Sequence, residues 1–220
     1  SYTMAYDDKV VAEIGSRVMA GLGTETASGS NDTVPVGVSN RHIHLSTADL
    51  ETLFGAGYEL TPIKDLSQPG QFACKETLTI VGPSLRPIEN VRVLGPVRKA
   101  SQVEISRTDS FTLKVKPPVR ESGDIAGSAP VTIIGPKGVV TLKEGCIIAN
   151  RHIHMSTDEG AQFGLSDGQY VDVEVSGERR TKFYDVQVRV HKDFRLEMHI
   201  DTDDANAAGI GNGAKVKIVK

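Results

Sequence analysis

The chain repeats one pentapeptide: Asn40-Arg41-His42-Ile43-His44 returns as Asn150-Arg151-His152-Ile153-His154. Each copy is followed by an apolar residue and then Ser-Thr, so a string of eight residues occurs twice. In an extended strand alternate side chains share a face, which puts the two histidines of a copy on one side, about 7 Å apart. A single His-x-His is typical of a surface or hydrogen-bonded pair, but two copies favour two halves of a metal site.

A helix start follows each histidine pair. Ser46-Thr47-Ala48-Asp49 and Ser156-Thr157-Asp158-Glu159 both have the Ser-x-x-acid form of a capping box. The first leads into an apolar stretch and predicts a helix that ends near Gly55. Because the free N–H groups and the dipole of a helix start favour anions, a phosphate beside a metal would be stabilised twice at this place.

Short stretches rich in Val, Ile and Thr recur between Gly and Pro residues, and each predicts a strand. They are Val34–Val38, Thr77–Val81, Val91–Leu94, Val103–Ser106, Phe111–Val115, Val131–Ile134, Val139–Leu142, Cys146–Ala149, Tyr170–Val175, Phe183–Val190, Leu196–Ile200 and Lys215–Val219. This pattern, with few long helical segments, favours a mainly β protein built as barrels or sandwiches over a doubly wound sheet. A chain of 220 residues can bury one large core or two small ones, and the internal repeat favours two.

Composition argues against two classes of partner. The net charge is −3, which gives no electrostatic footprint for nucleic acid. No apolar run approaches the roughly 18 residues of a membrane span, and the N-terminus has no apolar secretory segment. Cys74 and Cys146 stand outside any Cys-x-x-Cys pattern, so we expect small buried side chains and no disulfide framework. We therefore expect a cytoplasmic protein without nucleic acid or membrane partners.

One predicted helix lies outside the β pattern. Between Asp7 and Leu22 the apolar residues fall on one stripe at helical spacing, and a Gly/Ser/Thr/Asn-rich segment follows from Gly23 to Thr33. An amphipathic helix on such a tether either packs on its own domain or serves as a docking or encapsulation tag. Both interpretations stay open.

A third ligand for each histidine pair must come from elsewhere in the chain. His199 alternates with apolar residues and shares a strand face with Glu197 and Asp201, so it could complete a three-histidine set. Glu104 shares a face with Gln102 in the same way, and an inward glutamate costs free energy unless it is paired or metal-bound. Both are ligand candidates, although either one alone is also typical of a salt-bridged or surface residue.

Further motifs accompany the two pentapeptides. They are Gln68–Ala73 followed by Lys75–Thr77, Gly95–Lys99 leading to Gln102–Ser106, and Met198–Asp203 with Ala205–Ala207. With these motifs, in this order, the chain resembles the PduL-type phosphate propanoyltransferases, which are phosphotransacylases associated with bacterial microcompartments. The resemblance extends from about Val34 to the C-terminus.

The resemblance implies two β-barrel domains, each with short capping helices, that enclose a dinuclear zinc site. The barrels would not be consecutive in the chain, because the segment before the first pentapeptide would join the C-terminal barrel. We accordingly expect a first barrel from residues 41–150 and a second from residues 34–40 with 151–220. Residues 1–33 would be the amphipathic helix and its linker.

The resemblance also implies the site residues. The first zinc would be held by His42, His44 and Glu104, the second by His152, His154 and His199, and phosphate by a catalytic arginine, Arg98. Such ligands suit zinc, but cobalt, nickel or iron could take the same positions. We further expect four residues to bind substrate: Asn40, Ser46, Gln71 and Lys75.

The implied activity interconverts acyl-CoA plus phosphate with acyl phosphate plus CoA, as in propanediol degradation. Phosphate is ionised at pH 7 and a thiol of pKa about 8.5 leaves readily, so no Ser or Cys nucleophile is needed. The hypothesis is direct attack of metal-bound phosphate on the thioester, with the chain length, propanoyl or acetyl, left open. The resemblance implies a location inside a microcompartment, with docking to shell or core proteins by the N-terminal helix. Exposed barrel surfaces and the amphipathic helix favour a homo-oligomer. The alternatives are a metal-dependent hydrolase on the same scaffold and a structural protein with metal staples.

Overall fold

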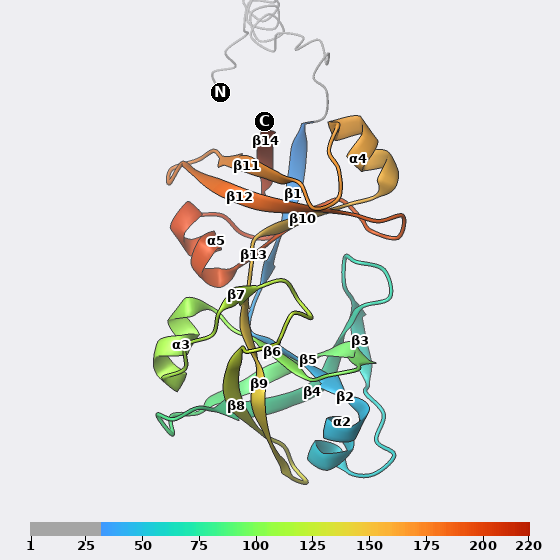
Figure 1. Cartoon of the computed structure of the whole chain (residues 1–220), viewed down its shortest axis with the longest axis vertical. Coiled ribbons are helices and arrows are strands. Elements are labelled where there is room, and N and C mark those ends of the chain that lie inside the picture. Colours follow the sequence, from blue (N-terminus) through green and yellow to red (C-terminus); the bar gives the residue numbers. More distant parts are fainter. Residues whose placement is uncertain (1–31) are drawn as a thin grey trace, which may run out of the picture. The chain divides into compact units, whose positions relative to one another are not determined.

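The computed structural model describes residues 32–220, so the helix expected between Asp7 and Leu22 lies outside the described residues. Within this range the chain is mainly β, and its strands close into two six-stranded barrels (Figure 1). This confirms the mainly β class predicted from the strand pattern and the two barrels implied by the family resemblance. No helix in the described part of the chain is long and apolar enough to span a membrane.

The first barrel is a ring in which each strand pairs with the next and the last returns to the first. In ring order its strands are β4 (Phe72–Val81), β5 (Ile88–Arg98), β2 (His42–Ser46), β6 (Gln102–Glu104), β9 (Val139–Ala149) and β8 (Ala129–Ile134). Two short strands extend it, β3 (Pro62–Asp65) beside β4 and β7 (Val119–Arg120) beside β9.

The second barrel closes in the same way. In ring order its strands are β1 (Thr33–Ser39), β13 (Glu197–Asp201), β10 (His152–Met155), β12 (Thr181–Val190), β11 (Tyr170–Val175) and β14 (Lys215–Val219). The strand with the second histidine pair, β10, runs parallel to β12 and antiparallel to β13. Its counterpart β2 runs parallel to β5 and antiparallel to β6, so the two barrels repeat one plan.

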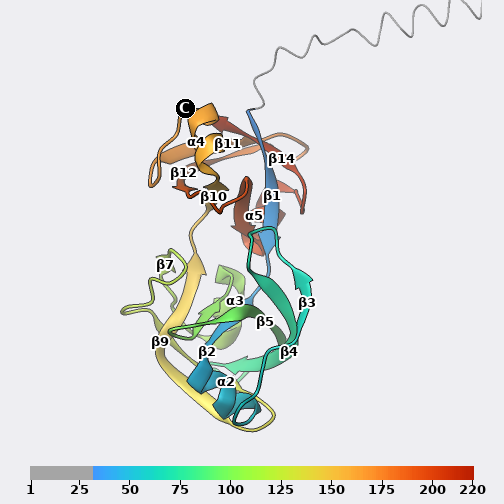
Figure 2. The same cartoon turned by 90° about the vertical axis from the view of Figure 1, so that its right-hand side faces the viewer.

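Each barrel contains one strand that is followed directly in the sequence by a strand of the other barrel. Strand β1 directly precedes β2 in the sequence, yet it pairs with β13 and β14 of the second barrel (Figure 2). Likewise β9 directly precedes β10, yet it pairs with β6 and β8 of the first barrel. Main-chain hydrogen bonds thus join the two halves, and these pairings support the proposed division into residues 41–150 and residues 34–40 with 151–220.

Two separate apolar cores fill the barrels, and alternation decides which side chains enter them. Ile43 of β2 and Ile153 of β10 are fully buried, each in the core of its own barrel. The histidines that flank each isoleucine therefore point to the opposite face of the strand. Cys74 and Cys146 are free and buried as expected, and burial raises the pKa of the two thiols to about 11 and about 12.

Four short helices follow the four strands that carry the ligand candidates. They are α2 (Thr47–Phe54), α3 (Arg107–Leu113), α4 (Thr157–Phe163) and α5 (Thr202–Ala208), after β2, β6, β10 and β13. The two predicted helix starts are confirmed: Ser46 accepts a hydrogen bond from the Asp49 N–H, and Ser156 forms a reciprocal capping box with Glu159. Helix α2 ends at Gly55 as predicted.

Three of the predicted strands differ from the structure. The stretch Phe111–Val115 is predicted as a strand, but it begins inside α3, because Ser106 and Asp109 form a reciprocal capping box that starts a helix. Phe111 is 73% exposed, so its alternation with Leu113 does not mark a sheet face. The stretches Val139–Leu142 and Cys146–Ala149 are parts of one long strand, β9, which continues through Gly145 at a positive φ of 141°.

Candidate metal centre and active site

The same strand register places the candidate third ligand beside the first histidine of each pair. In the first barrel His42 lies opposite Glu104 on the neighbouring strand β6. In the second barrel His152 lies opposite His199 on β13. Because residues in register share a face of the sheet, each barrel gathers three candidate ligands on the face that points away from its own core. The structure therefore brings together both ligand sets expected from the sequence.

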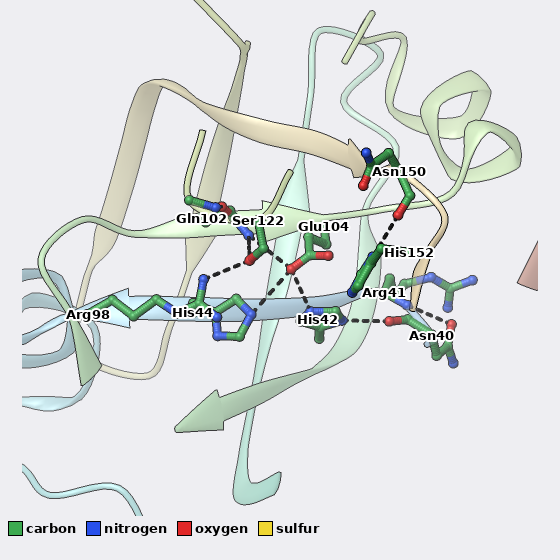
Figure 3. A network of polar contacts seen from close by, with 11 residues as sticks. Asn40, Arg41, His42, His44, Arg98, Gln102, Glu104, Ser122, Asn150 and His152 are labelled. Carbon is green, nitrogen blue, oxygen red and sulfur yellow. Dashed lines mark hydrogen bonds and ion pairs between the residues drawn. The ribbon is translucent and has the colours of Figure 1, made fainter. Parts of the chain in front are cut away.

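The first cluster consists of His42, His44 and Glu104, all of which are buried. The Glu104 Oε2 atom lies 2.9 Å from Nε2 of His42 and 3.3 Å from Nε2 of His44 (Figure 3). The other ring nitrogen of His42, Nδ1, donates to the Asn40 carbonyl at 2.8 Å, so Nε2 is the nitrogen that faces the carboxylate.

Burial and charge act in opposite directions on the pKa values in this cluster. Burial alone would lower the pKa of His42, but the Glu104 carboxylate outweighs it and the pKa is raised. Burial would raise the pKa of Glu104, yet the charge and hydrogen bonds of the two histidines hold it well below its usual value. For His44 burial dominates and lowers the pKa to about 4. The cluster thus holds an ion pair beside a neutral imidazole.

The second cluster consists of His152, His154 and His199. Their ring centroids lie 4.8 to 5.1 Å apart, with the His152 and His199 rings parallel and the His154 ring perpendicular to both. Nδ1 of His152 donates to the Asn150 carbonyl at 2.8 Å, which repeats the contact of His42 with Asn40.

All three imidazoles of the second cluster are neutral at pH 7. Burial lowers the pKa of His152 to about 4, of His154 to about 2 and of His199 to about 4. Glu104 of the first cluster acts on the pKa of both His152 and His199, so the two clusters lie within electrostatic reach of each other.

The donor atoms fit divalent metal ions. In each cluster one ligand atom per residue lies within 4.8 Å of the other two, and residues 32–220 contain these two clusters of this kind. Metal binding requires neutral imidazoles and an ionised carboxylate, so an ion in the first cluster would displace the proton that pairs His42 with Glu104. Among the described residues, Nδ1 of His44 and Nδ1 of His154 are also buried without a hydrogen-bond partner. Three nitrogen or oxygen donors per site suit zinc with an open coordination position.

Arg98 lies at the end of β5, half-buried beside the first cluster. Its Nη1 donates to the Ser122 hydroxyl at 2.9 Å, and its charge acts on the pKa of both His42 and His44 (Figure 3). Arg98 also lines a hollow of about 240 Å³. The other lining residues are Pro69, Gly70, Gln71, Gly95 and Pro96. An arginine in such a position can hold two oxygens of one phosphate.

The four expected substrate-binding residues have different positions. Gln71 lines the hollow with Arg98, and Asn40 supplies the carbonyl that orients His42. Ser46 caps α2, and its main-chain N–H donates to the Ser101 hydroxyl. Lys75 is exposed on β4, where its main chain contacts Thr61 and Arg92. Substrate contact stays a prediction for all four.

Sequence reasoning missed a second arginine. Arg189 on β12 lies in register with His154, and its charge contributes to the lowered pKa values of His152, His154 and His199. It also acts on the pKa of Arg98, so both guanidinium groups belong to one electrostatic neighbourhood. The alternation of Val186, Val188 and Val190 with Gln187 and Arg189 in the predicted strand was the available signal.

Fold and site together define the class: a duplicated double-β-barrel protein with two candidate metal clusters and two arginines nearby. The family model for phosphate propanoyltransferase matches residues 35–211. The chain belongs to this family and is a phosphate acyltransferase.

Individual relatives agree with the family model. The phosphate propanoyltransferase of Lachnoclostridium phytofermentans is 57% identical, over 94% of this chain and 97% of the relative. That of Thermotoga maritima is 61% identical, over 84% of this chain and 88% of the relative. That of Rhodobacter capsulatus is 47% identical, over 97% and 96%.

Proposed function

We propose that the chain interconverts a short-chain acyl-CoA plus phosphate with acyl phosphate plus CoA, with propanoyl-CoA or acetyl-CoA as the acyl donor. The names of the relatives support the propanoyl group. The observation that carries the proposal is the pair of three-donor clusters within electrostatic reach of each other and of Arg98 and Arg189. Such a site is suited to a small, highly charged substrate.

We propose two metal ions, of which zinc fits the donor sets best, although cobalt, nickel or iron could occupy the same donors. One would be held by His42, His44 and Glu104, the other by the second cluster. When bound, such ions fix phosphate and withdraw electrons from the thioester carbonyl. The remaining steps depend on residues of the chain itself.

The phosphate is held by Arg98, whose guanidinium can bind two of its oxygens. The Ser122 hydroxyl keeps that guanidinium in place, so less conformational entropy is lost when phosphate binds. With phosphate and thioester held together, a phosphate oxygen attacks the carbonyl carbon directly, in an effectively unimolecular step. The C–O bond forms, the C–S bond breaks, and the thiolate leaves without an acid because its pKa is about 8.5.

A thiol-release assay tests the proposed function. The purified chain is incubated with propanoyl-CoA or acetyl-CoA, with and without phosphate, and free CoA is measured. We expect release that depends on phosphate and sequential kinetics, because no acyl-enzyme forms. Release without phosphate would instead indicate a thioester hydrolase. Ping-pong kinetics or a trapped acylated residue would contradict direct attack.

We also propose that the segment before residue 32 docks the enzyme to shell or core proteins of a bacterial microcompartment, and that the enzyme is a homo-oligomer. The amphipathic pattern between Asp7 and Leu22 supports this. Deletion of residues 1–31 leaves β1 intact, so kcat/KM is expected to stay unchanged while localisation or oligomeric state changes. Loss of activity with retained localisation would favour a structural role for the segment.

A further inference from the structure

The residue two positions before each third ligand occupies an equivalent place in the two barrels. Gln102 lies in register with His44, and Glu197 lies in register with His154. Each is on the same strand face as the third ligand, which is Glu104 in one barrel and His199 in the other. The two positions carry opposite hydrogen-bonding chemistry, an amide donor beside a carboxylate and a carboxylate acceptor beside an imidazole.

Gln102 is almost fully buried, at 1% exposure, and uses both ends of its amide. Its Nε2 donates to Oε2 of Glu104 at 2.9 Å and to the Ser122 hydroxyl at 3.0 Å (Figure 3). Its Oε1 accepts a 2.6 Å hydrogen bond from the Gly123 main-chain N–H. Gln102 therefore directs an N–H at the carboxylate of Glu104 and is itself held by the loop at Ser122.

Glu197 is held by a loop serine in the same manner. The Ser67 hydroxyl donates to Oε1 of Glu197 at 2.5 Å, and the same oxygen lies 3.2 Å from Nε2 of His199, although the two are not aligned as a hydrogen bond. Strand β1 leaves room for this carboxylate, because a Cβ atom on Gly37 would lie 2.5 Å from Oε1 of Glu197. In the first barrel the place that corresponds to Gly37 is taken by Ile147, which lies in register with Glu104.

We propose that Gln102 and Glu197 are positioning residues, each matched to the third ligand beside it. The amide of Gln102 orients the Glu104 carboxylate, and Glu197 accepts a hydrogen bond from the Nε2–H of His199, which leaves Nδ1 free for a metal. Neighbours of this kind fix the tautomer and orientation of ligands and strengthen their binding. This inference rests on the proposed metal centre but concerns metal affinity, which can be measured without any acyl transfer.

Isosteric single substitutions give the first test. We expect Glu197→Gln to weaken zinc binding at one of two sites by about 10- to 100-fold in a chelator competition titration. Gln102→Glu is expected to do the same at the other site. Cobalt(II) absorption should change for one bound ion only in each variant. Glu174→Gln, an exposed change on β11 in the second barrel, is the matched control and should alter neither reading.

Gly37→Ala tests the same contact without changing any polar group. The added Cβ meets the far end of a flexible side chain, so it should displace the Glu197 carboxylate with little loss of thermal stability. We expect weaker zinc binding with an unfolding temperature close to that of the wild type. Unchanged zinc affinity in both Gly37→Ala and Glu197→Gln would overturn the role of Glu197.

An exchange of partners is the sharpest test. Glu104→His places an imidazole beside Gln102, which is a mismatch, and the added change Gln102→Glu restores a matched pair like that of the second barrel. We expect the double variant to bind zinc at least about tenfold more tightly than Glu104→His alone. A double variant that binds no more tightly overturns the matching. A wild-type chain that binds no metal overturns the metal centre itself, and the thiol-release assay reports the proposed activity independently.

Discussion

The first and second clusters share strands, register and helix starts, but they differ in charge. Each places two histidines on a strand between a parallel and an antiparallel neighbour, and each takes its third donor from the antiparallel one. Glu104 makes the first cluster an ion pair with His42, whereas His199 leaves the second cluster with three neutral imidazoles. Duplication therefore determined where the donors lie, and one residue per barrel determined their electrostatics.

This difference has a chemical consequence for the proposed centre. A divalent ion keeps a larger net charge among three neutral ligands than among two neutral ligands and a carboxylate. We therefore expect the ion of the second cluster to be the stronger Lewis acid and that of the first to be the more firmly held.

Removal of one histidine from either cluster should have the largest effect. His42→Ala and His152→Ala are each expected to lose one of two bound ions and to lower kcat by at least about a thousandfold, since each ion supplies several kcal/mol of charge stabilisation. Metal content and the thiol-release rate measure this. Wild-type enzyme stripped by a chelator and reloaded with zinc is the control. If His152→Ala retained both ions and full activity, the two-site assignment would be wrong.

Substitution of Arg98 should weaken phosphate binding more than substitution of Arg189. Arg98 is anchored by Ser122 and lines the hollow, whereas Arg189 lies over the Phe194 ring at 5.6 Å. Arg98→Lys keeps the charge but loses the planar fork, so we expect KM for phosphate to rise about 10- to 100-fold. Arg189→Lys should raise it by less than about tenfold. Initial rates at varied phosphate concentration measure both KM values, and thermal unfolding is the control for folding. A larger effect of Arg189→Lys would indicate that phosphate binds at the second barrel.

A buried glutamate outside both clusters should affect stability alone. Glu76 on β4 accepts hydrogen bonds from the Tyr58 hydroxyl and from the Thr61 N–H and hydroxyl. Burial would raise the pKa of Glu76, but these donors lower it below its ordinary value. We expect Glu76→Gln to reduce the free energy of unfolding at pH 7 by about 1 to 3 kcal/mol and to leave metal content unchanged.

The sign of the pH dependence follows from the lowered pKa of Glu76. The ionised carboxylate stabilises the fold fully above its unfolded pKa of about 4.3, and this contribution is lost as the pH falls through the folded value. The difference in stability between wild type and Glu76→Gln should therefore shrink below pH of about 4. Denaturant unfolding at several pH values measures it. A difference in the free energy of unfolding that does not change with pH would show that the charge of the Glu76 carboxylate does not contribute to stability.

Local patterns in the sequence predicted much of the fold. Strands with alternating or continuous apolar residues were found because a period of two is readable from neighbours alone. Helices α2 and α4 were found from their capping boxes, while α3 was missed although Ser106 and Asp109 form the same motif. The error arose because the Phe-x-Leu-x-Val pattern of residues 111–115 mimics a strand face, and only packing reveals that Phe111 is exposed.

The candidate site was less accessible from the sequence. The histidine pairs were evident, and Glu104 and His199 were candidates among several polar residues on strand faces. Arg189, Ser122 and Ser67 were not singled out, because each reaches the clusters through contacts with distant segments. The Ser67–Glu197 hydrogen bond, for example, joins residues 130 positions apart in the chain.

The sequence by itself determined the duplication, the mainly β class, the face on which each histidine pair lies and the helix starts behind them. These follow from side-chain alternation and capping, which act within a few residues. Only the tertiary structure decided which strands pair to close each barrel and which residues stand beside the third ligands. The physical reason is register: hydrogen bonds between strands set His42 opposite Glu104, 62 residues away, and a shift of one residue would turn these side chains to the other face.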